Sequence, residues 1–64
     1  MAKVETNTRK IIERLEQDRW TNIGGGGHDR FIHEDRPEMM IPVSRHRELS
    51  TGAARSIAKA AGWI

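Results

Sequence analysis

The chain has 64 residues, which is enough for one domain, and a domain of this size buries only about 60% of the surface that its unfolded chain exposes. It contains no cysteine, which excludes disulfides and thiolate metal sites and is typical of a reducing cytosol. No apolar stretch is long enough to cross a bilayer, and the polar start Met1-Ala2-Lys3-Val4-Glu5 is unlike a signal peptide. We therefore expect a single domain over residues 1–64 that stays in the cytoplasm.

Charge is distributed unevenly along the sequence. Eleven Lys and Arg stand against nine Asp and Glu, a net charge of +2 that does not by itself identify a nucleic-acid binder. From residue 42 onward, however, Glu48 is the single acid and the possible bases are Arg45, His46, Arg47, Arg55 and Lys59. A basic carboxyl-terminal half of this kind suits a phosphate backbone or an acidic partner.

The first predicted element is an amphipathic helix over residues 6–19. Its apolar residues Ile11, Ile12 and Leu15 recur on one helix face, and charged residues fill the other face. Thr6 or Asn7 is the expected N-cap. No glycine marks the carboxyl end at Asp18-Arg19, so the sequence does not define that boundary sharply.

Residues 20–23 and 28–33 are predicted to form two short strands. The tract Gly24–Gly27 lies between them, and we expect it to be a flexible hairpin connection because glycine runs weaken any packed element. A phosphate-binding glycine loop is the weaker alternative, since the tract lacks the Lys and Ser/Thr of a P-loop and precedes a strand instead of a helix.

A third strand is predicted over residues 38–43, after a turn at Glu34–Pro37. Pro42 indicates an edge strand or a strand end, because proline cannot donate to a ladder. The simplest closure is a three-stranded antiparallel meander. A polar, basic loop over residues 44–50 then leads to the last element.

The last predicted element is an alanine-rich helix capped by Ser50 or Thr51 and stopped at Gly62. Its packing face comprises Ala54, Ile57, Ala58 and Ala61. Arg55 and Lys59 lie four residues apart on another face and form an exposed basic rim. The overall expectation is an α+β fold with α-β-β-β-α order and two helices on one face of the sheet.

His28 is the candidate catalytic residue. Strand alternation places it on the face opposite Phe31, so it is exposed if Phe31 belongs to the core, and the preceding glycines leave access to it open. Histidine can take a proton from a ribose 2′-hydroxyl or deliver one to a leaving oxygen, and neighbouring arginines stabilise charge on phosphate. The competing interpretation is a solvated surface histidine with no role.

The other two histidines are weaker candidates. His33 shares the face of Phe31 and is expected to be partly buried or turn-facing, and His46 lies in the basic loop. The histidine spacings match no metal-ligand pattern, so neither a metal nor another cofactor is expected.

Six short stretches resemble, in order and spacing, the HicA family of toxin–antitoxin mRNA interferases, and the likeness covers almost the whole chain. They are Arg19-Trp20, Gly27-His28-Asp29-Arg30-Phe31, Met40-Ile41-Pro42-Val43, Arg47-Glu48-Leu49, Gly52-Ala53-Ala54-Arg55-Ser56-Ile57 and Ala61-Gly62-Trp63-Ile64. The resemblance implies a fold similar to a double-stranded-RNA-binding domain, cleavage of mRNA, and neutralisation by a HicB-type antitoxin. Proton transfer by a histidine, as described above, requires no metal. It also implies that the family's catalytic histidine corresponds to His28.

The sequence departs from the family pattern near this histidine. Gly27 replaces the usual serine, the basic residue common just upstream is missing, and Ser44 stands where histidine or another polar base is frequent. The departures predict either an attenuated toxin or one that relies on another cation such as Arg30 or Arg45.

Three functions therefore remain open at the level of sequence. The first is a ribonuclease toxin in which His28 acts as general acid or base and RNA is bound by Arg30, Arg45, Arg47, Arg55 and Lys59. The second is a non-catalytic RNA-binding module that recognises the phosphate backbone by shape. The third is a protein-interaction domain whose basic half meets an acidic partner.

Overall fold

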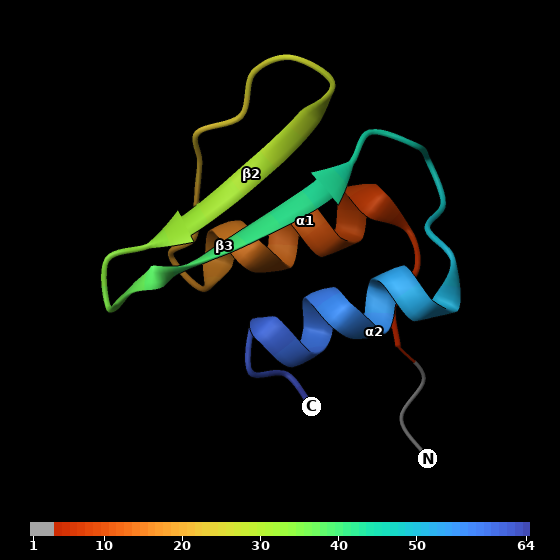
Figure 1. Cartoon of the computed structure of the whole chain (residues 1–64). Helices are drawn as coiled ribbons and strands as arrows, with labels where there is room; N and C mark the ends of the chain where they lie inside the picture. Colours follow the sequence, from red (N-terminus) through yellow and green to blue (C-terminus); the bar gives the residue numbers. More distant parts are fainter. Residues whose placement is uncertain (1–3) are drawn as a thin grey trace.

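The computed structural model describes residues 4–64 and contains two helices and a three-stranded sheet. In chain order the elements are α1 (Thr8–Gln17), β1 (Thr21–Asn22), β2 (His28–His33), β3 (Arg36–Ser44) and α2 (Thr51–Ala60). The strands are antiparallel in the order β1-β2-β3, and the α-helices lie on one side of the sheet (Figure 1). The predicted α+β fold with α-β-β-β-α order is confirmed.

One hydrophobic core forms between the helices and the inner face of the sheet. Phe31 at its centre is fully buried, as strand alternation predicts. The core residues are Ile11 and Leu15 of α1, Trp20, Phe31, Ile41 and Val43 of the sheet region, and Leu49, Ala54 and Ile57 at α2. The outer face of the sheet is left open to solvent, and Ile23, Ile32 and Met40 are exposed large apolar residues in the strand region.

Helix α1 is shorter than the predicted span of residues 6–19. Asn7 is its N-cap, with the side chain accepting a hydrogen bond from the Lys10 amide at 3.1 Å. At the other end Arg19 adopts a φ of 72°, and the Trp20 amide donates to the Leu15 carbonyl at 2.9 Å. This is a Schellman termination with arginine at the position that glycine usually occupies, so the sequence contained no visible stop.

Helix α2 has the predicted caps and ends in the same way. Ser50 accepts from the Ala53 amide at 3.2 Å, Gly62 has a φ of 81°, and the Trp63 amide donates to the Ala58 carbonyl at 2.8 Å. The Trp63 indole then donates to Asp18 at 2.6 Å, joining the carboxyl ends of the helices.

A short backbone bridge joins the amino ends of the two helices. The Thr8 amide donates to the Arg47 carbonyl at 3.0 Å, and the Leu49 amide donates to the Thr6 carbonyl at 2.9 Å. The helices consequently start side by side and run in the same direction across the sheet (Figure 1). Neither helix in residues 4–64 has the length and hydrophobicity that a transmembrane helix needs.

The strand β2 has the predicted bounds, whereas β1 is reduced to two residues and β3 is longer than predicted. The turn comprises only Glu34 and Asp35, so the prediction of a turn through Pro37 is wrong. Arg36 already pairs with His33, next to an irregularity in the register. Proline is tolerated in β3 because this strand lies at the edge of the sheet, as Pro42 predicted.

Candidate active site

His28 and Arg30 lie on the open face of the sheet, and both side chains are exposed. In the β2–β3 register, His28 is directly opposite Ser44 and Arg30 is directly opposite Pro42. Directly opposed residues share a face, with their Cβ atoms about 4.5–5.5 Å apart. The structure therefore brings an imidazole, a guanidinium and a hydroxyl together on one exposed patch.

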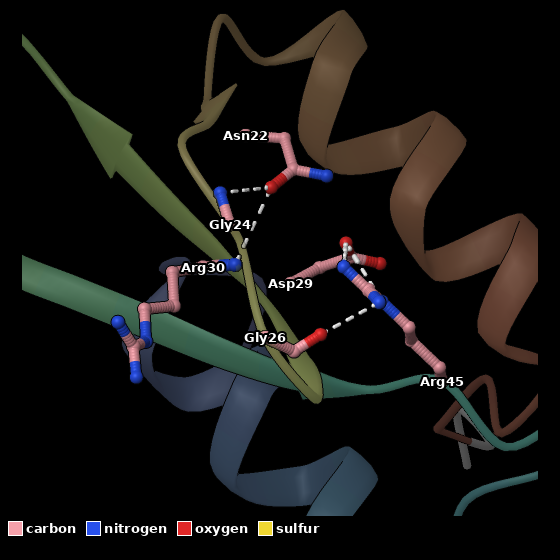
Figure 2. Close-up of polar contacts among 6 residues, drawn as sticks. All are labelled: Asn22, Gly24, Gly26, Asp29, Arg30 and Arg45. Atoms are coloured by element: carbon pink, nitrogen blue, oxygen red, sulfur yellow. Dashed lines mark hydrogen bonds and ion pairs between the residues drawn. The ribbon is translucent and has the colours of Figure 1, made fainter.

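The glycine tract before His28 is held by the side chain of Asn22. The Asn22 carbonyl oxygen accepts from the Gly24 amide at 2.8 Å and from the Arg30 amide at 3.4 Å (Figure 2). A Cβ at Gly24 would come within 2.7 Å of the Asp29 Cα, so the backbones approach too closely for any other residue. The first glycine is required by packing, and Gly25 then forms a bridge with His28.

Arg45 holds the tract from its other side. Its guanidinium donates to the Gly26 carbonyl at 2.9 Å and pairs with the Asp29 carboxylate at 3.3 Å (Figure 2). Gly26 has a φ of 66°, which favours glycine at this position. Specific hydrogen bonds accompany the path of the chain into His28, and the flexibility of this connection stays a prediction. We call the set Asn22, Gly24, Gly26, Asp29 and Arg45 the glycine clamp.

The predicted RNA-binding residues do not gather at one place. Arg30 points away from the Arg45–Asp29 pair (Figure 2), toward the open face that it shares with His28. Arg55 and Lys59 are exposed on α2, on a different side of the helix from the centre of the face formed by Ala53, Ser56 and Ala60. Arg47 is exposed in the loop before α2. Arg30 is thus the predicted cation that shares the face of His28.

A groove between β3 and α2 runs up to His28 and has a volume of about 370 Å³. The groove is lined by His28, Met40, Ile41, Pro42, Ser44, Leu49, Ala53, Ser56, Ile57 and Ala60. Sequence reasoning missed both the groove and the position of Ser44 beside His28. The position of Ser44 could have been predicted by extending the antiparallel pairing of the second and third strands to residue 44. The groove was indicated by the small residues on one face of the last helix.

The other two histidines have structural contacts. The His33 Nδ1 accepts from the Asp35 amide at 3.1 Å, which leaves Nε2 to donate to the Asp18 carbonyl at 2.9 Å. Its ring also stands edge-on to Trp20 with 5.1 Å between the centroids. His33 is half-buried, as predicted, and ties the β2–β3 turn to the end of α1. Exposed His46 contributes its backbone carbonyl to the Thr8 hydroxyl.

Acidic and histidine side chains are dispersed over the molecule. Within residues 4–64, no three of them come close enough together to hold a metal ion.

Comparisons with known proteins identify the chain by its family. A comparison with curated proteins finds no match. The model of the family described as the HicA toxin of bacterial toxin–antitoxin systems matches residues 8–63, from the first residue of α1 to Trp63 after α2. The match spans both helices, all three strands and His28 with its neighbours. The chain therefore belongs to the HicA family, the toxins of bacterial toxin–antitoxin systems.

Proposed function

We propose that the chain is a ribonuclease toxin that cleaves mRNA with His28 as its catalytic residue and that a HicB-type antitoxin neutralises it. The observation that carries the proposal is the placement of His28, exposed on the open face of the sheet between the glycine clamp and Arg30. The family assignment supplies an antitoxin as the partner.

The patch around His28 suits proton transfer at a ribose phosphate. A neutral imidazole can remove the proton from a 2′-hydroxyl as the oxygen attacks the adjacent phosphorus, and an imidazolium can protonate the departing 5′-oxygen. Arg30 shares the face of His28 and lies two residues away, where it can stabilise the negative charge that develops on the phosphate oxygens. Ser44, directly opposite, adds a hydroxyl that can donate to the same oxygens.

The remaining basic residues extend the surface available to RNA. We assign phosphate contacts to Arg45, Arg47, Arg55 and Lys59, of which Arg45 also holds the glycine clamp. All four side chains are exposed, so RNA can reach them without rearrangement of the core. Contacts of this kind give affinity that falls with salt and carry no base specificity.

Replacement of His28 by alanine tests the assignment. The parent protein is expected to cleave a long single-stranded RNA in the presence of EDTA, and His28→Ala is expected to lose at least about 100-fold in rate, the usual contribution of a general acid–base residue. His46→Ala is the matched control, because His46 is exposed and its contact with Thr8 uses the backbone carbonyl. Circular dichroism establishes that all three proteins are folded.

Two results would contradict the proposal. Equal cleavage by the parent and His28→Ala would remove His28 from the reaction. Binding of RNA by all three proteins without cleavage would favour a non-catalytic RNA-binding module of the same fold.

A further inference from the structure

The lining of the groove between β3 and α2 is mostly apolar, in contrast to the basic residues proposed to contact RNA phosphates. Apolar side chains form most of it, among them Met40 and Ile57, and it contains no Asp, Glu, Lys or Arg. Its polar side chains are the hydroxyls of Ser44 and Ser56 and the imidazole of His28 at one end. Such a groove offers a phosphate no positively charged arginine or lysine to bind, whereas a flat, neutral ring with polar edges can pack against its apolar side chains.

We infer that this groove binds the nucleobase of the nucleotide next to the phosphate on which His28 acts. The inference rests on the proposed ribonuclease function and names a subsite for its substrate. Its volume of about 370 Å³ lies at the lower end of the range for small-molecule sites, which is suited to one base and not to a stretch of RNA. Because His28 belongs to the lining, a base in the groove remains attached to a phosphate within reach of the imidazole.

The backbone of β3 supplies hydrogen-bonding groups at the groove. The Ile23 amide donates to the Arg30 carbonyl at 2.7 Å, so the backbone groups of Arg30 face β1. Its partner Pro42 is then in a non-hydrogen-bonded pair, and the Pro42 carbonyl points away from β2, across the free edge of β3. By alternation the amide and carbonyl of Ser44 point the same way. Acceptors and a donor at this edge match the polar edge of an unstacked base.

The same edge is unsuited to an added peptide strand. A partner strand needs a regular row of donors and acceptors, and Pro42 has no N–H to offer at its centre. A single base requires only one or two of these groups. The occupant that fits both the apolar wall and the interrupted edge is therefore a nucleobase.

Nucleotide titration tests the groove without reference to catalysis. The probes are the four ribonucleoside 3′-monophosphates, and ribose 5-phosphate is the control that carries phosphate and sugar but no base. We expect saturable changes in the amide NMR signals of Ala53, Ser56 and Ala60 with at least one nucleotide and none with ribose 5-phosphate. Identical changes with ribose 5-phosphate, or changes confined to other residues, would overturn the inference.

Filling the groove tests its role in the reaction. Ser56→Leu and Ala60→Leu add apolar volume inside the groove, and Gln17→Leu makes a similar addition on the exposed face of α1 as a control. Either groove variant is expected to raise the KM for a single-stranded oligoribonucleotide about tenfold or more, because the leucine side chain occupies space that the base needs, while Gln17→Leu leaves the KM unchanged.

The failures of the two proposals are distinguishable. Cleavage with an unchanged KM in both folded groove variants would overturn the base subsite and leave the ribonuclease intact. Nucleotide binding in the groove of a protein that cleaves no RNA would support the subsite and contradict the ribonuclease.

Discussion

Arg45 is the residue on which the path of the chain into His28 depends most directly. One guanidinium bridges the Gly26 carbonyl and the Asp29 carboxylate, two groups on either side of His28 in sequence. Its side chain is 51% exposed, so the ion pair with Asp29 adds little to global stability. Its importance lies in geometry, because a glycine-rich segment has many alternative paths and the bidentate contact selects one.

Arg45→Lys is expected to lower the kcat for RNA cleavage about tenfold with a much smaller change in KM. Lysine keeps the charge for RNA, but a single ammonium does not reproduce the planar fork that reaches both partners, and a displaced His28 loses rate. Steady-state kinetics of Arg45→Lys and of the control Arg47→Lys separate the two effects. The Arg47 side chain makes no hydrogen bond or ion pair within residues 4–64. An unchanged kcat in Arg45→Lys would show that Arg45 acts through its charge alone, and an equal loss of kcat in Arg47→Lys would show that the effect does not depend on the contacts of Arg45.

At the scale of single elements, the two helices end with the same hydrogen-bond pattern but different residues. Each has a residue with positive φ after its C-cap, Arg19 after α1 and Gly62 after α2, and a tryptophan follows each. For a residue with a Cβ, the left-handed conformation costs about 1–2 kcal/mol. The end of α1 is therefore strained where the end of α2 is not.

Arg19→Gly is expected to raise the free energy of unfolding by about 0.5–1 kcal/mol. Glycine removes the strain of the left-handed conformation, but the greater conformational entropy of glycine in the unfolded chain offsets part of this stabilisation. Gly62→Ala, the reverse change at the equivalent position, is expected to lower it by a similar amount or more, since the new Cβ also meets the Arg36 guanidinium at 3.3 Å. Urea denaturation measures both. If Arg19→Gly instead lowers the free energy of unfolding, the contacts of the arginine side chain stabilise the protein by more than the strain of its backbone destabilises it.

Features that depend on neighbouring residues could be predicted from the sequence, whereas contacts between distant segments could not. Local signals narrowed the first N-cap to Thr6 or Asn7 and were sufficient for the bounds of β2 and the exposure of His28, because capping and alternation depend on neighbouring residues. Arg45 and Gly26 are 19 residues apart, and nothing in their local patterns indicates that they meet. The groove likewise depends on how far α2 lies from β3, which helical periodicity does not specify.

At the scale of the whole molecule, one small core supports every feature of the site. A 64-residue domain has a free energy of unfolding of about 3–10 kcal/mol at the usual value per residue. Phe31 is completely buried at the centre of the only core cluster found in residues 4–64. Loss of its ring therefore removes a large fraction of this free energy.

Phe31→Ala is therefore expected to lower the free energy of unfolding by about 3–5 kcal/mol and to lower the midpoint of thermal unfolding accordingly. Ile32 is the next residue in the strand, lies on the open face and is 36% exposed. Ile32→Ala is therefore expected to lower the free energy of unfolding by less than about 1 kcal/mol. Thermal unfolding followed by circular dichroism compares them. A Phe31→Ala protein as stable as Ile32→Ala would show that the core repacks around the missing ring.

The backbone bridge between the segments before α1 and α2 also gives the molecule an electrical polarity. Because the helices start together and run in the same direction, their macrodipoles add, with the positive ends near Leu49. Strand β3 ends on the side of the molecule where both helices start (Figure 1), and His28 is directly opposite Ser44 at that strand end, so the positive pole lies at the end that carries the candidate catalytic residue. A protein with a net charge of only +2 can in this way present an attractive field to a polyanion at one end while remaining nearly neutral as a whole.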